Sequence, residues 1–293
     1  MSTESVSERF TELDAWSVGD ALEAMLEGQM RAAAACVAAL PAMTAAVEGA
    51  AAALGASGRL VYLGAGTSGR VAVQDGAELP PTFNWPRKRL LFLMAGGPDA
   101  LLNSVEGAED DGADAARQID LAEIGSNDVV IGVAASGRTP FTVSGVRRAA
   151  ERGALTIGVA NNPGTPLLDA SRHPVLVDTG AEVIAGSTRM KAGTAQKIVL
   201  NLLSTGIMIR LGRIYRGMMV NMLASNAKLR KRSEDIVVAI TGCDEKAARE
   251  ALDDANGDMK LASLIALGIA REEALVKLAQ HSGNLRRAIS AAG

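Results

Sequence analysis

The fold class is decided by one stretch, LVYLGAGTSGR at residues 60–70. Four apolar residues run into a glycine-rich turn, which is typical of a buried strand that leads into a helix. Similar short apolar runs recur, each followed by a turn and a helical pattern, at residues 90–94, 129–133, 155–159 and 175–177. Strands that alternate with helices pair in parallel through crossovers. We therefore predict an α/β fold, a five-stranded, parallel, doubly wound sheet of the flavodoxin-like type, with ligands at the carboxyl ends of its strands.

Helical patterns flank this predicted domain on both sides. Apolar residues recur at three- and four-residue spacing from Trp16 to Leu54, with Ser17 as a helix start and Pro41 in the first turn of a second helix. We predict an N-terminal helical arm at 1–51, the sheet domain at 52–215 and a C-terminal helical region at 216–293. After the fifth strand, one long helix is expected from just after Ser187, past residue 218, to Arg232. A small three-helix unit is expected at 236–267.

Charge and composition narrow the classes of partner. The 293 residues carry 30 basic and 33 acidic side chains, a net charge of −3, and no basic block that would bind nucleic-acid phosphates. The polar, acidic start MSTESVSERFTELD does not have the pattern of a secretory signal. The alanine-rich stretch 31–54 falls short of the roughly 20 strongly apolar residues of a membrane span. We expect a cytoplasmic protein that binds neither nucleic acid nor membrane.

The residues that usually hold metals are scarce. The chain has two cysteines, Cys36 and Cys243, and two histidines, His173 and His281, all far apart in the sequence. They form neither a CxxC pair nor a zinc-ligand spacing. We expect no metal site and no disulfide framework.

The turn after the first strand matches the GxGxxG pattern of dinucleotide-binding proteins. That pattern also requires an acidic residue at the end of the second strand, to bind the ribose. The second strand ends Met94-Ala95-Gly96-Gly97, without a carboxylate. The dinucleotide interpretation is therefore not favoured.

The same turn offers hydroxyl groups beside backbone N–H groups at a helix start, which suits a phosphate. A second such turn follows the third strand, and a third precedes the long helix. Each turn alone is typical of a capped helix start, but three of them favour one shared phosphate site. The candidate binding residues are Thr67, Ser68 and Gly69 in the first turn, Ser136, Gly137 and Thr139 in the second, and Ser187, Arg189 and Lys191 in the third.

Two acidic positions are candidates for acid–base chemistry. Glu78 stands before Leu79-Pro80-Pro81, where a helix must end, and Glu109 lies in the acidic run VEGAEDD at 105–111. From composition alone, both are typical of hydrated surface carboxylates. A pair of carboxyl groups near a bound ligand would suffice for general acid–base catalysis.

Several motifs together resemble those of the N-acetylmuramic acid 6-phosphate etherases. They are TESVSERFTELD at 3–14, GAGTSGR at 64–70, ELPPTF at 78–83, VEGAEDD at 105–111, AASGRTP at 134–140, STRMKAGTAQK at 187–197 and TGCDEKAAREAL at 241–252. They occur in order over nearly the whole chain. The central part is similar to the sugar isomerase (SIS) domain, a phosphosugar-binding module that the non-catalytic glucokinase regulatory protein also uses.

The resemblance implies cleavage of the D-lactyl ether of N-acetylmuramic acid 6-phosphate, without cofactor or metal, in peptidoglycan recycling. It places Glu78 on the family's proton donor and Glu109 on the second active-site acid. It places Ser68, Ser136 and Thr139 on the hydroxyls that contact phosphate. The resemblance, together with the apolar neighbours of Glu78, favours Glu78 as the acid that protonates the leaving lactate. It favours Glu109 as the base that takes the C2 proton.

Two other functions use the same phosphate site. A phosphosugar isomerase would need the site and a base but would release no lactate. A sensor would bind the phosphosugar without turnover, although no helix-turn-helix segment is evident in the sequence. We also expect a homodimer, because SIS domains commonly pair and the alanine- and methionine-rich helix at 18–40 carries few charges.

Overall fold

The computed structural model describes residues 2–224 and 226–291, which form two compact units. The first unit holds residues 2–77 and 88–205, and the second holds residues 78–87 and the described part of 206–291. The division of the chain into domains at 1–51, 52–215 and 216–293 stays a prediction. By its contacts, the N-terminal arm belongs to the same unit as the sheet.

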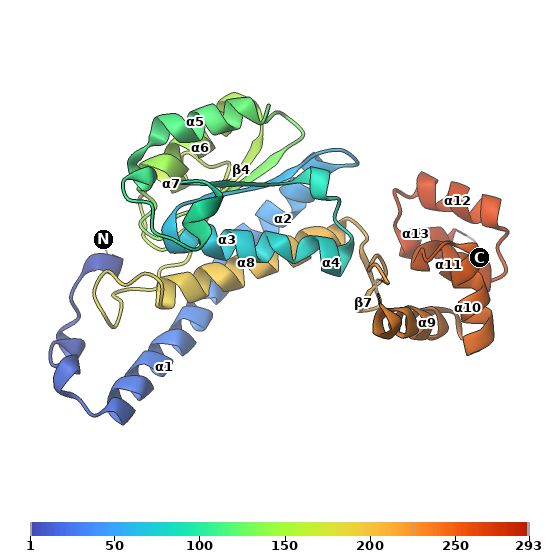
Figure 1. The fold of residues 1–293 in the computed structure, drawn as a ribbon, viewed down its shortest axis with the longest axis horizontal. Coiled ribbons are helices and arrows are strands. Elements are labelled where there is room, and N and C mark those ends of the chain that lie inside the picture. Colours follow the sequence, from blue (N-terminus) through green and yellow to red (C-terminus); the bar gives the residue numbers. More distant parts are fainter. Residues whose placement is uncertain (1, 225, 292–293) are drawn as a thin grey trace. The chain divides into compact units, whose positions relative to one another are not determined.

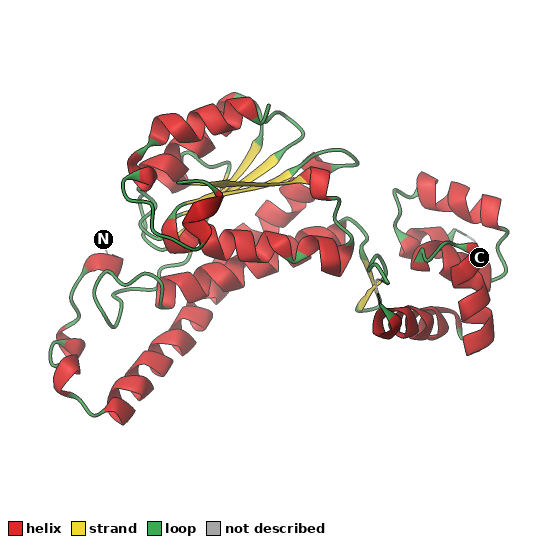
Figure 2. Cartoon of the chain, viewed as in Figure 1, coloured by secondary structure: helices red, strands yellow, loops and turns green. Residues whose placement is uncertain are grey.

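The centre of the first unit is a parallel sheet with the strand order β2-β1-β3-β4-β5, shown in Figure 2. Its strands are β1 (Leu60–Gly64), β2 (Leu90–Met94), β3 (Val129–Val133), β4 (Leu155–Ala160) and β5 (His173–Leu176). The prediction of five parallel strands is confirmed, and the first four lie within one residue of the predicted runs. The fifth begins two residues early and ends one residue early.

Helices cover both faces of this sheet (Figure 1). One layer contains α5 (Gly112–Leu121), α6 (Pro140–Glu151) and α7 (Pro166–Asp169). The other contains α2 (Leu40–Leu54), α3 (Gly66–Ala77) and α8 (Lys191–Arg210). Short 3-10 helices lie in connecting loops at Arg87–Arg89, Pro98–Leu101 and Ala108–Asp110. The strands β1 and β3 are fully buried between the layers, so their continuous apolar sequences are explained by burial on both faces.

The N-terminal arm begins with 3-10 turns at Ser2–Glu4, Glu8–Phe10 and Leu13–Ala15 and continues as α1 (Val18–Ala35), a 3-10 turn at Cys36–Ala39, and α2. The Ser17 side chain accepts a hydrogen bond from the Asp20 N–H, and Pro41 lies in the first turn of α2. Both predicted helix starts are therefore confirmed.

By length and composition, Val18–Leu54 is long and apolar enough to cross a membrane. The apolar character of residues 31–54 alone did not predict this. The fold uses its second half in the core instead. In α2, Met43, Ala46, Ala50 and Leu54 are buried, and the helix packs on β4 and β5.

The prediction of one long helix that runs past residue 218 to Arg232 is wrong, because α8 ends at Arg210. Gly212 has a φ of 69°, a left-handed conformation that ends a helix. An antiparallel hairpin of β6 (Ile214–Tyr215) and β7 (Met218–Met219) follows. Arg216 and Gly217 form its turn, both with positive φ, as two-residue hairpin turns require.

The second unit is otherwise helical. Its helices are α4 (Leu79–Phe83), α9 (Ala227–Thr241), α10 (Glu245–Asp254), α11 (Met259–Ala266), α12 (Arg271–Gln280) and α13 (Leu285–Ser290). The predicted small helical unit at 236–267 corresponds to the end of α9, α10 and α11. Arg213 joins residues 78–87 to this unit, since its guanidinium donates to the carbonyls of Phe83 and Asn84 and lies 5.0 Å from the centre of the Trp85 ring.

An ion pair before β3 gives the first stability prediction. The buried Asp128 carboxylate accepts hydrogen bonds from the Arg59 side chain and from the N–H groups of Arg59 and Gly125. Burial alone would raise the pKa of Asp128, but these donors lower it below its ordinary value. Asp128→Ala leaves buried donors unpaired, and we expect it to lower the free energy of unfolding by about 2–4 kcal/mol near pH 7.

The more exposed Asp120, which pairs with Arg148 and Arg152, provides the control. Asp120→Ala should lower the free energy of unfolding much less in the same urea titration, because water screens an exposed ion pair. Since the folded-state pKa of Asp128 is depressed, its contribution is complete above the unfolded-state value and is lost as the pH falls through the folded-state value. The difference between wild type and Asp128→Ala should therefore narrow below about pH 4. An equal cost for the two variants at pH 7 would contradict the prediction.

Candidate active site

The site lies where the winding of the sheet reverses. From β1 the chain enters α3 on one face of the sheet, and from β3 it enters α6 on the other face. The carboxyl ends of β1 and β3 are neighbours, with Gly64 paired to Val133. In open α/β sheets, ligands bind in the crevice outside such a switch point. The topology therefore puts the first two predicted phosphate turns at neighbouring strand ends.

The first turn packs closely because of its glycines. A Cβ atom on Gly69 would lie 2.9 Å from the Gly64 carbonyl, so Gly69 lets α3 start directly against β1. This packing explains Gly69 without a ligand. Ser68 in the same helical turn is buried, and Thr67 is half-buried. The first N–H groups of a helix have no partner within it, so the start of α3 has donors for an anion.

The second turn has a similar build. Gly137 has a φ of 63°, and a Cβ atom there would lie 2.3 Å from the Thr165 hydroxyl, which explains this glycine by packing. The Ser136 hydroxyl accepts a hydrogen bond from the Arg138 N–H at 3.1 Å. Thr139 is the N-cap residue of α6, yet its side chain makes no capping bond, and both hydroxyl residues are half-buried.

The third turn has two features that the sequence did not predict. First, Glu182 caps the start of α8, because its fully buried carboxylate accepts from the N–H groups of Lys191 and Ala192 at 3.0 and 2.9 Å. This carboxylate already compensates the positive end of the helix dipole. Glu182 could not be recognised from the sequence, since eight residues lie between it and the helix and no local capping pattern links them.

Second, the Lys191 ammonium has partners of its own. It is buried and donates to the carbonyl oxygens of Thr179 and Ala181. Burial lowers its pKa. Lys191 lines a separate cavity of about 250 Å³ with Arg9 and Arg31. These bonds give Lys191 a structural role, and its predicted phosphate contact stays a prediction. Ser187 is half-buried and Arg189 exposed in the same turn.

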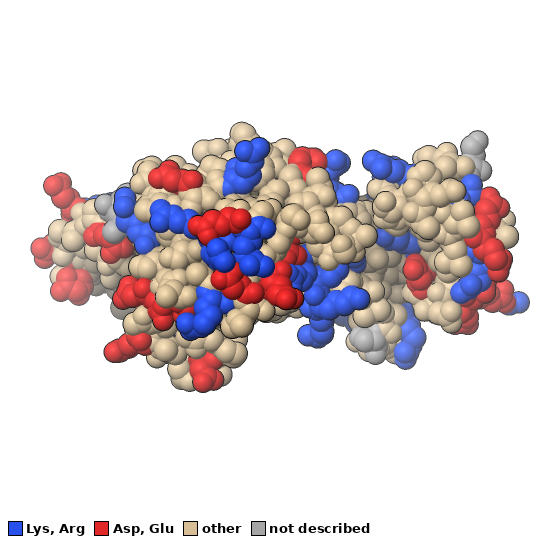
Figure 3. Space-filling model, turned by 90° about the horizontal axis from the view of Figure 1, so that it is seen from above, with Lys and Arg blue, Asp and Glu red and all other residues tan. Residues whose placement is uncertain are grey.

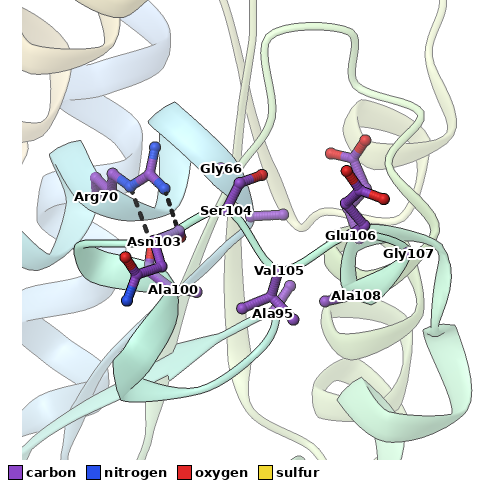
Figure 4. Close-up of a pocket in the computed structure, with 12 residues that line it drawn as sticks. Gly66, Arg70, Ala95, Ala100, Asn103, Ser104, Val105, Glu106, Gly107 and Ala108 are labelled. Atoms are coloured by element: carbon purple, nitrogen blue, oxygen red, sulfur yellow. Dashed lines mark hydrogen bonds between the residues drawn. The ribbon is translucent and has the colours of Figure 1, made fainter.

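A cavity of about 290 Å³ lies beside the first turn (Figure 4). Its walls are Ala65, Gly66, Arg70, Ala95, Ala100 and residues 103–109, including the carboxylates of Glu106 and Glu109. The structure therefore places Glu109 in one cavity with Gly66 and Arg70 of the first turn, whereas Thr67, Ser68 and Gly69 do not line it.

Arg70 stabilises this cavity wall. Its guanidinium donates to the carbonyls of Ala100 and Asn103, both at 3.0 Å, and so ties α3 to the segment that carries Glu106 and Glu109, as Figure 4 shows. The quoted motif GAGTSGR contains Arg70, but only the tertiary structure shows what it binds.

Glu78 follows α3 directly and is the N-cap residue of α4, in the second unit. Its side chain is exposed, and it makes no capping bond. The expectation of an apolar setting for Glu78 is wrong: Leu79 is buried, whereas Glu78 faces solvent because Pro80 and Pro81 start a new helix there.

A buried network holds the last turn of α3 before Glu78. Asp75 accepts hydrogen bonds from the Tyr62 hydroxyl on β1 at 2.8 Å and from the Ser204 hydroxyl on α8 at 3.2 Å. Burial raises the pKa of Asp75. The end of α3 is thereby fixed to a strand and a helix.

Charges of both signs are interspersed on the face shown in Figure 3. On α5 and α6, ion pairs join Arg148 to Asp120 and Arg117 to Asp114. Among residues 2–224 and 226–291, no group of three or more His, Cys, Asp or Glu side chains could hold a metal ion.

The fold and its three polar turns define a domain of the sugar isomerase (SIS) class. The model of the glucokinase regulatory protein N-terminal SIS domain matches residues 42–149, and that of the SIS domain matches residues 107–206. Among solved structures, a phosphoheptose isomerase from Francisella tularensis is similar, with a TM-score of 0.49 and 17% identity over 66% of this chain and 100% of that one.

Curated proteins extend the similarity over nearly the full length. The N-acetylmuramic acid 6-phosphate etherase of Deinococcus radiodurans is 47% identical over 98% of this chain and 94% of its own length. That of Rubrobacter xylanophilus is 45% identical over 98% and 95%. The chain belongs to the N-acetylmuramic acid 6-phosphate etherase family, and the resemblance read from its motifs is confirmed.

Proposed function

We propose that the protein cleaves the D-lactyl ether of N-acetylmuramic acid 6-phosphate, giving N-acetylglucosamine 6-phosphate and D-lactate. The carrying observation is the 47% identity to a protein of that name over almost the whole of both chains. The cavity that joins Glu109 to the first phosphate turn supports the proposal. The reaction belongs to the recycling of cell-wall amino sugars, and we propose that it takes place in the cytoplasm and without a cofactor.

The chemistry needs one base and one acid. In the open-chain sugar, the C1 aldehyde acidifies the C2 proton, and the lactyl oxygen on C3 lies β to C1. Glu109 takes the C2 proton, the C3–O bond breaks, and Glu78 gives a proton to the departing lactate oxygen. Water then adds its oxygen to C3 of the unsaturated aldehyde, and a proton returns to C2. Two carboxyl groups in opposite protonation states can perform these steps.

The phosphate anchors the sugar at the switch point. We assign its contacts to Thr67, Ser68, Ser136 and Thr139, together with the free N–H groups at the start of α3. Ser187 and Arg189 contribute from the third turn. Hydroxyl and N–H donors at helix starts, with the Arg189 cation, suit a phosphate dianion.

The test is release of D-lactate when the purified protein is mixed with N-acetylmuramic acid 6-phosphate. Stoichiometric appearance of D-lactate and N-acetylglucosamine 6-phosphate supports the etherase. Interconversion of a phosphosugar without lactate would identify an isomerase, and saturable binding without turnover would identify a sensor. Either result would replace the proposed activity.

We further propose that the protein is a homodimer that pairs through α1. Val18, Leu22, Leu26 and Met30 recur at four-residue spacing and are 57–76% exposed. An apolar stripe of this kind on a helix marks an association surface. A second copy fits it, since helices with such stripes pack against each other along their length.

Leu22→Glu combined with Leu26→Glu should convert the dimer to a monomer in sedimentation velocity at micromolar concentration. The dimer of this variant would bury two carboxylates of each protomer in the interface. Leu121→Glu, at a position 76% exposed on α5, is the control and should leave the dimer intact. A wild-type protein that sediments only as a monomer would reject this interface.

A further inference from the structure

The N-terminal turn is attached to the carboxyl edge of the sheet. Thr3 is fully buried, although it lies in a 3-10 turn at the beginning of the chain. Its backbone N–H donates to the Asn162 side-chain oxygen at 3.4 Å, and its hydroxyl accepts from the Asn162 amide at 2.9 Å. Asn162 follows β4 and is itself buried. The segment thus makes a paired contact at the end of a central strand, 159 residues away in sequence.

Two of the proposed phosphate turns meet in this contact. The same Asn162 amide donates to the carbonyl of Ala135 at 2.9 Å, directly before Ser136. On the other side, the Thr3 carbonyl accepts from the Gly186 N–H at 3.1 Å, directly before Ser187. Figure 1 shows the N-terminal segment beside the loop that leads into α8. A continuous chain of hydrogen bonds therefore runs from the Ser136 turn through Asn162 and Thr3 to the Ser187 turn.

The hydrogen bond from the Asn162 amide requires a small residue with a hydroxyl group at position 3. Its hydroxyl satisfies a buried amide that would otherwise lose a partner, at a cost typical of an unpaired buried group. Both turns lie outside the regular strands and helices. The hydrogen bonds of Thr3 and Asn162 therefore help to set the spacing of the two turns. A phosphate that spans them is bound well only when that spacing is fixed beforehand.

We propose that Thr3 is a positioning residue for the phosphosugar: through Asn162 and Gly186, it holds the Ser136 and Ser187 turns at the spacing that the phosphate requires. The inference rests on the proposed function for the identity of the ligand. Thr3 takes no part in proton transfer. Its loss should therefore weaken substrate binding and leave the chemical step unchanged.

The test compares three variants with wild type. Thr3→Val keeps the shape and removes the hydroxyl, and should raise KM about five- to tenfold while kcat stays within about twofold. Thr3→Ser restores the hydroxyl and should return KM to within about twofold of wild type. Thr11→Val removes an exposed hydroxyl of the same N-terminal segment, which donates to the Glu8 carbonyl, and is the matched control with unchanged kinetics.

Hydrogen exchange adds a readout that does not depend on turnover. The Gly186 N–H should exchange faster in Thr3→Val, while amides in β3 stay protected as in wild type. A change in kcat at constant KM, or an unchanged KM alongside faster Gly186 exchange, would overturn the positioning role.

Binding separates this inference from the proposed activity. If wild type releases no lactate, calorimetry with N-acetylglucosamine 6-phosphate still measures the affinity of the proposed turns for a phosphosugar. A Kd raised about five- to tenfold in Thr3→Val supports the inference even though the etherase proposal fails. An equal Kd in both proteins, or no binding by wild type, overturns the inference.

Discussion

Glu78→Gln is expected to abolish lactate release while exchange of the C2 proton continues. A glutamine cannot protonate the departing lactate, so the C3–O bond stays intact. Glu109 can still remove the C2 proton and return a deuteron from heavy water. Mass spectrometry of the recovered substrate should show one deuterium at C2, and kcat should fall at least about a hundredfold.

Glu109→Gln should lose both lactate release and C2 exchange, because the base itself is missing. Asp110→Asn provides the control, since Asp110 is exposed in the same 3-10 turn and does not line the cavity. Exchange that is lost in Glu78→Gln and kept in Glu109→Gln would reverse the two roles. Near-normal lactate release in both variants would remove these carboxylates from the mechanism.

Removal of the phosphate from the substrate is expected to have a similarly large effect. Unphosphorylated N-acetylmuramic acid forgoes several charge-assisted hydrogen bonds, each worth about 1.5–3 kcal/mol. Its kcat/KM should be lower by about a thousandfold or more. Parallel assays of the two sugars measure this ratio, and equal rates would contradict the phosphate site.

Serine variants place that effect on the proposed turns. Ser68→Ala and Ser136→Ala should each weaken use of the phosphorylated substrate about tenfold and barely change the unphosphorylated one. Ser126→Ala, at an exposed position in the loop before β3, is the control for a serine outside the proposed site. A loss of the same size with both sugars would show that the serines act through folding, not through the phosphate.

The sequence alone determined the sheet, because its signals are local. Leu60–Leu63 and Val129–Val133 form uninterrupted apolar runs that only a strand buried on both faces explains. Ser17 and Pro41 marked helix starts through interactions within one turn. The family also followed from the sequence, since its motifs are continuous stretches such as GAGTSGR and ELPPTF.

Contacts between distant residues could only be seen in the tertiary structure. Glu182 caps α8, Lys191 turns to the carbonyls of Thr179 and Ala181, and Thr3 binds Asn162. The exposure of Glu78 was likewise hidden, because neighbours in sequence do not fix burial. Periodicity reports which face of an element meets the core, whereas partners of a polar side chain depend on which chain segments the fold brings together. The sequence therefore determined the sheet, the turns and the family, and the tertiary structure decided which polar groups are paired within the fold.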